Sequence, residues 1–197
     1  LFYNCFIRTL TLSEEITSIG IKSFSRCMIN EIKFHCKSKL TEISSYAFYK
    51  SENRSEIQFP NSIINIGNYS FAYGKIFASI TLPNSVSSIG IGFFGECFQL
   101  ESITVSSRNS HYKSVEGVLF SKDGSKLLRY PSGKKETSYR VPSNVEIIYD
   151  SAFSCSNYYI EGTPIKCHFD SNSWKNYNVH AKIQTSYEPH LIFSLDW

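Results

Sequence analysis

The sequence contains no hydrophobic run that is long enough to cross a membrane. No segment approaches the roughly 18 consecutive apolar residues of a membrane-spanning helix, although 42% of the 197 residues are hydrophobic. Only 10 glycines are present and no heptad pattern persists, which excludes collagen and coiled coils. Aromatic residues make up 15% of the chain, too many for a chain that is disordered throughout. The composition therefore indicates one folded domain or one short solenoid with a sizeable core.

Charge of one sign is also scarce. The 20 Lys and Arg residues exceed the 17 Asp and Glu residues by a formal net charge of only +3, whereas nucleic-acid-binding domains carry a denser basic stripe. We therefore expect no nucleic-acid partner. The six cysteines include no Cys-x-x-Cys pair, so we predict no metal site and no cofactor. A bridge between Cys5 and Cys36, or between Cys155 and Cys167, stays open.

Short segments of alternating apolar residues recur along the chain. Their first residues lie 22, 25, 23, 23 and 36 positions apart. In such a segment every second side chain faces the same way, as in a β-strand. Pro60, Pro83 and Pro142 follow three of them directly and end the strand pairing, because proline has no N–H to donate. The six segments are Leu10-x-Leu12, Ile32-x-Phe34, Ile57-x-Phe59, Ile80-x-Leu82, Ile103-x-Val105 and Tyr139-x-Val141.

Two columns of apolar residues follow these segments at constant spacing. The isoleucine column consists of Ile19, Ile43, Ile66, Ile89 and Ile148. The phenylalanine column comes five residues later in each unit and consists of Phe24, Phe48, Phe71, Phe94 and Phe153. One unit cannot bury its own apolar edge, but stacked units share a continuous core. We therefore predict a solenoid in which the phenylalanine rings stack from coil to coil, with a short helical turn before each phenylalanine.

The pattern resembles the leucine-rich repeats of the BspA-like, or Treponema pallidum, type. Their unit reads approximately L-x-x-I-x-I-P-x-x-V-x-x-I-G-x-x-A-F-x-x-C, and residues 79–90 with Phe94 and Cys97 match it nearly in full. The resemblance covers about residues 7–157, and residues 31–53 depart from it locally. It implies an α/β repeat solenoid: a right-handed superhelix with a parallel β-sheet on its concave face, short helical or irregular turns on its convex face, and one inserted β-hairpin.

The 36-residue interval contains the predicted hairpin, which we expect to protrude from the solenoid at about residues 116–131. Asp123-Gly124 is a strong two-residue turn signal between two apolar segments. We expect one domain over residues 1–187, whose part at 158–187 is a degenerate last turn and cap with Trp174 as its plug. Residues 188–197 are predicted to be a tail or the start of missing sequence. Because the first residue is leucine, we interpret the chain as a fragment or a processed form.

No arrangement of residues in the sequence supports catalysis. Residues 90–95 fit the Gly-x-Gly-x-x-Gly pattern of dinucleotide sites, but Gly90 and Phe94 already belong to repeat columns. The neighbours Cys167 and His168 would point opposite ways in an extended chain, which argues against a nucleophilic pair. His35 stands at a strand end and is expected to be solvated. We therefore predict that this segment is not an enzyme.

The outward positions of the predicted strands form the candidate binding surface. This surface is polar and of mixed sign, which suits a protein or carbohydrate ligand better than a small apolar molecule. The candidate residues on the concave face are Thr11, Lys33, Gln58, Thr81, Thr104, Arg140, Glu31 and Glu56.

A second candidate is the basic end of the hairpin. Two interpretations stay open for it: a contact site for an acidic partner, such as a sulfated glycan, or a solvated turn. Its residues are Lys122, Lys126, Arg129, Lys134 and Lys135.

Similar proteins are often surface antigens of bacteria and parasitic protists, implicated in adhesion to host cells or matrix. The resemblance thus implies a non-catalytic, cell-surface or secreted binding module. Two alternatives are a cytoplasmic scaffold or signalling adaptor, and a targeting arm for an enzyme that lies outside this chain.

Overall fold

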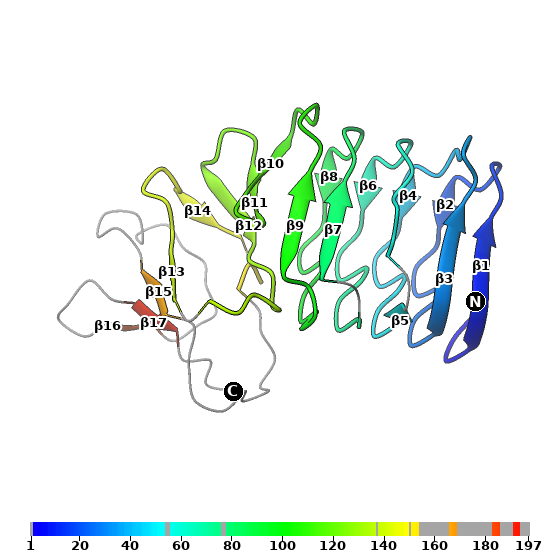
Figure 1. Cartoon of the computed structure of the whole chain (residues 1–197), viewed down its shortest axis with the longest axis horizontal. Coiled ribbons are helices and arrows are strands. Elements are labelled where there is room, and N and C mark those ends of the chain that lie inside the picture. The colour runs from blue at the N-terminus through cyan, green and yellow to red at the C-terminus, as the bar shows by residue number, and fades with distance from the viewer. Residues whose placement is uncertain are drawn as a thin grey trace.

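The computed structural model describes residues 2–53, 56–75, 78–136, 138–149 and 151–153, and the backbone of three short strands beyond them. Within these residues the chain runs in successive coils stacked side by side (Figure 1). Strands that follow one another in the repeat pair in sequential order, as predicted. The described residues contain no helix, so the α/β class and the short helical turns are wrong and irregular turns take their place. The right-handed course of the coils stays a prediction.

One side of the coils carries the first row of parallel strands. In register, Leu10 lies beside Ile32 and Ile80 lies beside Ile103. This row is divided into the sheets β1-β3-β5 and β7-β9. The row consists of β1 (Phe6–Leu12), β3 (Met28–Phe34), β5 (Glu52–Asn53), β7 (Ser79–Leu82) and β9 (Ser102–Val105).

The predicted strand at Ile57-x-Phe59 is absent, and this is where the first row divides. Residues 56–59 keep the expected alternation, with Ile57 buried and Gln58 exposed, but they form no strand. The interval that leads to Ile57 is 25 residues instead of 22 or 23. The strand is thus absent where the repeat interval is longer.

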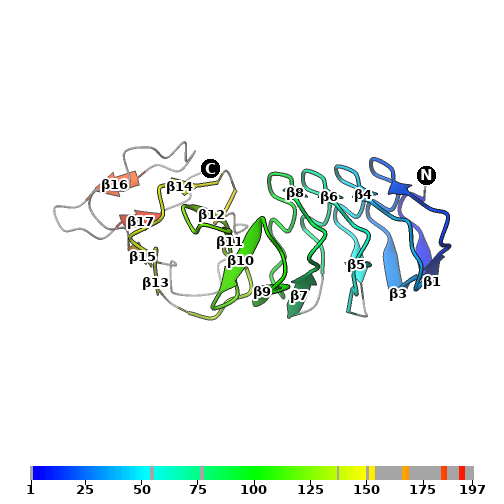
Figure 2. The ribbon, with the colours of Figure 1, turned by 90° about the horizontal axis from the view of Figure 1, so that it is seen from above.

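The opposite side of the coils carries the second row of strands (Figure 2). It forms one four-stranded parallel sheet, in the order β2-β4-β6-β8. The isoleucine column lies in register within it, since Ile19, Ile43 and Ile66 are each paired with the next member. The strands are β2 (Ser18–Ile19), β4 (Glu42–Ile43), β6 (Asn65–Ile66) and β8 (Ser88–Ile89).

The phenylalanine column forms the predicted stack between the two rows. Phe24 and Phe48 have ring centroids 5.3 Å apart, Phe48 and Phe71 5.0 Å, and Phe71 and Phe94 5.1 Å. Phe2 extends the stack by one ring at the N-terminal end, 5.6 Å from Phe24. These separations match the spacing of roughly 4.8 Å between neighbouring strands. The rings therefore lie one per coil along the solenoid.

The third side of each coil is a turn in which two residues have positive φ. In the second coil Lys22 and Arg26 have φ near +58° on either side of Phe24. Each such residue reverses the chain locally. As a result, the backbone N–H groups of Lys22, Phe24 and Arg26 all donate hydrogen bonds to carbonyls of the next coil. The same two positions recur as Tyr46 and Lys50, Tyr69 and Tyr73, and Gly92 and Glu96.

These turns carry a conformational cost that the contacts between coils offset. A left-handed conformation costs a non-glycine residue roughly 1–2 kcal/mol. Each turn gains three hydrogen bonds to its neighbour, such as those from Tyr46, Phe48 and Lys50 at 2.7–2.9 Å. Hydrogen bonds between coils therefore hold the turn in place of the i to i−4 backbone hydrogen bonds of an α-helix.

The glycines that follow three members of the isoleucine column differ in how closely the neighbouring coil approaches them. A Cβ placed on Gly67 would lie 2.5 Å from the backbone nitrogen of Ser45, whereas one on Gly20 would meet only the hydroxyl of Ser23, at 3.3 Å. We predict that Gly67→Ala lowers the free energy of unfolding by about 2 kcal/mol, because overpacking moves the backbone. Gly20→Ala, in the same column, should change it by less than about 0.5 kcal/mol. Urea denaturation of both variants measures the difference, and equal losses would contradict it.

The inserted hairpin at 116–131 is present, and it is part of the core. β11 (Val118–Ser121) pairs antiparallel with β12 (Lys126–Arg129) around Gly124. Two further strands complete this sheet, β10 (Tyr112–Val115) before it and β14 (Ile147–Ile148) after it. Val118 and Phe120 are buried, so the expectation that the hairpin protrudes from the solenoid is wrong.

The second strand of the hairpin takes the place of a coil. Leu127 pairs in parallel with Ile148, as each member of the isoleucine column pairs with the next. Tyr130 then stacks on Phe153 with ring centroids 5.4 Å apart, which places a tyrosine at the phenylalanine column. The aromatic spine of the solenoid therefore resumes after the insertion.

A last sheet in the order β13-β15-β17-β16 follows. β13 (Ser138–Arg140) overlaps the sixth predicted strand segment and pairs in parallel with β15 (Lys166–His168). β16 (Ile183–Thr185) and β17 (Leu191–Phe193) complete the sheet. β17 lies in the segment 188–197 that was predicted to be a tail, while Trp174, the predicted plug, lies outside the described residues.

Candidate binding surface

The exposed side of the first row presents hydroxyl groups in its middle. Thr81 and Thr104 lie opposite each other on β7 and β9, with their hydroxyl oxygens 2.7 Å apart. Ser79 lies opposite Ser102 on the same side. We call Ser79, Thr81, Ser102 and Thr104 the hydroxyl patch. Both threonines are exposed. Side chains alternate along a strand, so the preceding Ile80 and Ile103 face the core while the threonines face solvent.

The first coils of the same face carry charge. Thr11 lies beside Lys33 in register, and Lys33 Nζ is 3.1 Å from a carboxylate oxygen of Glu31 on its own strand. Both ends of this ion pair are solvent-exposed, so it contributes at most about 1 kcal/mol and leaves the ammonium accessible. Glu56 and Gln58 are exposed beyond it. The side chain of Arg140 lies outside the described residues.

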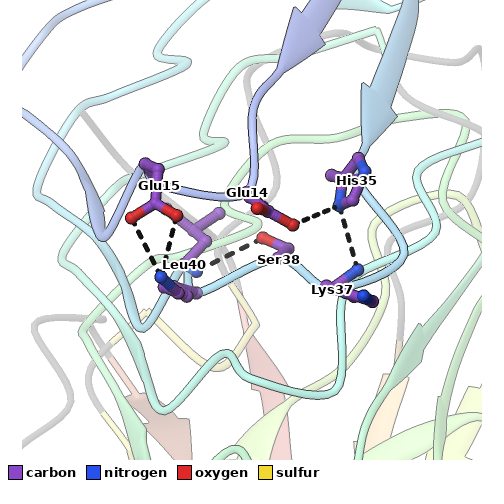
Figure 3. Close-up of polar contacts among 7 residues, drawn as sticks. Glu14, Glu15, His35, Lys37, Ser38 and Leu40 are labelled. Carbon is purple, nitrogen blue, oxygen red and sulfur yellow. Dashed lines mark hydrogen bonds and ion pairs between the residues drawn. The ribbon is translucent and has the colours of Figure 1, made fainter.

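Polar contacts join the first two coils at the edge of this face, where the strands end (Figure 3). Lys39 Nζ lies 2.8 and 2.9 Å from the two carboxylate oxygens of Glu15 on the preceding coil. His35 Nδ1 accepts the Lys37 N–H at 3.2 Å and lies 3.3 Å from Glu14. His35 is exposed, as expected, and its contacts are those of a surface turn between two coils.

The free edge of the first row is covered by the turn between β10 and β11. The Ile103 N–H donates to the Gly117 carbonyl at 2.9 Å, and the Ser114 hydroxyl donates to the Ile103 carbonyl at 2.5 Å. Glu116 and Gly117 both have positive φ, the conformation of a two-residue type I′ turn. The Glu-Gly pair was the available signal for this second hairpin, which the sequence analysis missed.

The five basic residues of the hairpin region have separate environments. Arg129 is only 1% exposed, so it belongs to the interior and is a correction to the predicted patch. Lys122 Nζ donates to the Asn109 carbonyl, Lys134 pairs with Glu136, and Lys135 pairs with Glu101. Lys126 is half-buried beside a cavity.

Comparison with known families decides what kind of solenoid this is. The BspA type leucine rich repeat region matches residues 1–123 in six copies. The chain belongs to the BspA-type leucine-rich repeat family. A comparison with curated proteins gives no match.

Two solved structures resemble this BspA-type chain. A leucine-rich repeat protein from Eubacterium ventriosum is 29% identical, with a TM-score of 0.69, over 74% of this chain and 38% of that protein. The pneumococcal vaccine antigen PcpA is 28% identical, with a TM-score of 0.58, over 74% of this chain and 42% of that protein. The chain thus spans about two fifths of either relative's length. Family membership makes it a repeat module of a kind associated with binding.

Two cysteines of the BspA-type repeat lie in the core. The thiols of Cys27 and Cys97 donate to the carbonyls of Phe2 and Phe71, at 2.8 and 3.2 Å, and thereby join successive coils. Burial raises the pKa of the Cys97 thiol to about 12. Cys5 and Cys36 are both free, so the bridge between them is not formed. Cys155 lies outside the described residues, and nothing is described of the Cys167 side chain.

A polar cluster that includes the buried Glu96 and Arg129 and the exposed Tyr73 was missed from the sequence. Burial raises the pKa of the Glu96 carboxyl, while a hydrogen bond from Tyr73 and the charge of Arg129 lower it. Burial and the nearby carboxylate raise the pKa of Tyr73 to about 12. The Arg129 guanidinium donates to the Ser151 carbonyl and to the Ser132 hydroxyl. The cluster joins the hairpin to the regular coils and has the form of a structural contact.

The described residues offer little for other kinds of chemistry. Among them no group of three or more His, Cys, Asp or Glu side chains is placed to hold a metal ion. The described residues likewise contain no helix that is long and apolar enough to cross a bilayer.

Proposed function

We propose that this chain is the non-catalytic recognition module of a cell-surface protein, and that its first row of strands binds a protein or a carbohydrate. The observation that carries the proposal is the hydroxyl patch. Ser79 and Ser102 lie in register, as do Thr81 and Thr104, on two paired strands. Hydroxyl groups both donate and accept hydrogen bonds, so the patch can meet amides, carboxylates or sugar hydroxyls.

The shape of the face supports a broad ligand. Its outward side chains come from flat, regularly spaced strands, and solenoids use such extended surfaces for recognition. Small apolar ligands require concave, mostly apolar pockets instead. The accessible Lys33 and Glu31 add charges of both signs at one end of the face. Charged groups near the rim of an interface contribute to specificity and to the rate of association.

Location at a cell surface is supported by the relatives. One similar structure is that of a pneumococcal vaccine antigen. An adhesive role toward host cells or matrix is the most direct function for such a module.

The alternative is a cytoplasmic scaffold or adaptor, which one observation favours. Cys5, Cys27, Cys36 and Cys97 are all free, and unpaired thiols persist best in reducing compartments. Intact mass and thiol counting on native protein separate the two cases. Glycans or disulfides would support the exterior, whereas six reduced cysteines without glycan would support the adaptor.

Binding to the face can be tested by removing its hydrogen bonds or reversing its charges. We expect Thr81→Val combined with Thr104→Val to weaken capture on an array of glycans and matrix proteins about tenfold, because two hydrogen-bonding groups are lost. Lys33→Glu combined with Arg140→Glu should also weaken capture. The free energy of unfolding should stay within about 0.5 kcal/mol, as for other surface changes.

Lys37→Glu provides the matched control, since Lys37 is exposed on the turn beyond the strand. It should leave capture unchanged. Capture that survives both face variants, or falls equally in the control, would move the site away from the first row.

A further inference from the structure

A cavity of about 210 Å³ lies where the second row of strands meets the hairpin region. One wall is the end of β8 and the following turn at Gly90 and Gly92, and the other wall includes Lys126 of β12. Gly90 and Gly92 belong to the Gly-x-Gly-x-x-Gly segment, which does not lead into a helix and is not a dinucleotide site. The cavity lies apart from the hydroxyl patch, whose residues do not line it.

The cavity exists because the insertion interrupts the second row. β8 is the last strand of its sheet, and β12 and β14 belong to another sheet. The side chain of Tyr112 covers part of the edge that the next coil would otherwise cover. Its hydroxyl donates to the Ser87 carbonyl at 3.1 Å. The ring replaces part of the missing coil, and the remaining space is the cavity.

The backbone of this wall retains an unused donor. In the preceding coils the residues at the same position, Lys22, Tyr46 and Tyr69, direct their N–H groups to a carbonyl of the next coil. The Gly92 N–H has no such partner among the residues that the structure describes. An unpaired N–H at the edge of an enclosed space favours a ligand that accepts a hydrogen bond.

The side chains around the cavity favour a negatively charged ligand. Lys126 and His111 line it, and no Asp or Glu is among the lining residues. No ion pair of the described residues includes Lys126. Hydrogen bonds from Ser121 and Ser125 are the main cause that lowers the pKa of the nearby Asp123 carboxyl, and the charge of Lys126 makes only the smallest contribution. The ammonium is therefore available to an anion, for which charge-assisted hydrogen bonds are the strongest.

The remaining surface of the cavity suits a small ring. Tyr112 and Tyr149 both line it, and Tyr149 is 38% exposed, so that part of its ring is open to contact. Ile89 and Leu128 add apolar surface. The volume equals that of about seven liquid waters and lies below the roughly 300–1,000 Å³ of drug-sized pockets. It therefore matches one sugar ring better than an oligosaccharide.

We propose that this cavity binds a single monosaccharide residue that carries one anionic group, with the anion between Lys126 and the Gly92 N–H and the ring against Tyr149. The site is separate from the strand face, so it gives the module a second recognition element. A carboxylated and a sulfated sugar share this chemistry. Either can be the end group of a larger glycan that continues into solvent.

The test is an NMR titration of the ¹⁵N-labelled full chain with D-glucuronate, D-glucose 6-sulfate and D-glucose. We expect at least one acidic sugar to shift the amide signals of residues 90–92 and to bind at least tenfold more tightly than glucose. The acidic sugar with the higher affinity identifies the natural anionic group. Failure of both acidic sugars, or equal binding of glucose, would overturn the proposal.

Variants place the ligand within the cavity. Lys126→Met should weaken binding of the acidic sugar at least tenfold, and Tyr149→Leu should weaken acidic and neutral sugars alike. Lys135→Met is the matched control, because Lys135 is 85% exposed and does not line the cavity. Unchanged binding in Lys126→Met, or shifts confined to the strand face, would contradict the site. The double variant Thr81→Val, Thr104→Val should leave sugar binding to the cavity intact. A failure of the cavity proposal is therefore distinguishable from a failure of the proposed binding to the strand face.

Discussion

Replacement of Phe71 by alanine is expected to lower the free energy of unfolding by about 3–5 kcal/mol, the range found for a fully buried phenylalanine. The Phe71 side chain is 1% exposed and lies in the middle of the phenylalanine column. Its ring contacts Phe48 at 5.0 Å and Phe94 at 5.1 Å between centroids. The loss includes the transfer of the ring, the cavity that remains and two ring stacks, because neighbouring coils are too closely bonded to collapse into the space.

Phe2→Ala is the matched control for this prediction. Phe2 belongs to the same column but ends it, with Phe24 as its stacking partner and 56% of its surface exposed. Its replacement should cost less than about 1 kcal/mol, since little apolar area is lost from the interior. Denaturant unfolding of the two variants gives the comparison. Similar losses at both positions would show that the column does not form a common spine.

Replacement of Arg129 by methionine is expected to cost about 3–5 kcal/mol at neutral pH, because it removes a buried cation whose charge stabilises the Glu96 carboxylate. Arg129 is 1% exposed, and its charge lowers the pKa of Glu96, which burial raises. The guanidinium also binds the Ser151 carbonyl and the Ser132 hydroxyl. Lys135→Met removes only an exposed pair with Glu101 and should stay within about 0.5 kcal/mol.

The pH dependence of the Arg129→Met variant gives an independent check. Without Arg129 the pKa of Glu96 rises further above its usual value of 4.5. A carboxyl with a raised pKa in the folded state adds stability below the unfolded pKa, and this contribution disappears as the pH rises through the folded pKa. The deficit of the variant should therefore shrink between pH 7 and pH 4.5. A deficit that is constant over this range would mean that Glu96 is not the group affected.

Several features of the fold could be predicted because they depend on spacing alone. The isoleucine and phenylalanine columns are set by a repeat, and a repeat places equivalent residues at equivalent positions of each coil. Ile43 and Ile66 are accordingly fully buried, and Phe48 stacks on Phe71. The position of the hairpin was predictable at Asp123-Gly124, because this pair favours a chain reversal, although the connection spans residues 122–125 and only Gly124 has positive φ.

The turns were wrongly predicted because their conformation is imposed by the neighbouring coil. Lys22, Tyr46 and Tyr69 show no local preference for positive φ, which is usual only for glycine and asparagine. Hydrogen bonds to the next coil hold these residues in that conformation. No pattern within a single unit reports such bonds.

Some of the candidate site residues could also be predicted from the sequence, and others could not. Thr81 and Thr104 were predictable as outward positions, since alternation along a strand decides which side faces solvent. Arg129 was predicted to be exposed from the basic residues around it, but its partners Ser132 and Ser151 come together only after the chain has folded. The cavity at Gly92 depends on how the insertion interrupts the second row, which composition and spacing do not show.

A designed disulfide tests most directly whether successive coils stack in register. Thr81 and Thr104 are direct neighbours on β7 and β9, and strands roughly 4.8 Å apart lie within the Cα separation that a disulfide bridges. Peptide mapping after mild oxidation should find Thr81→Cys linked to Thr104→Cys in high yield. The offset pair Thr81→Cys and Ser102→Cys should link poorly. Efficient linkage of the offset pair, or none between positions 81 and 104, would contradict the stacked arrangement of the coils.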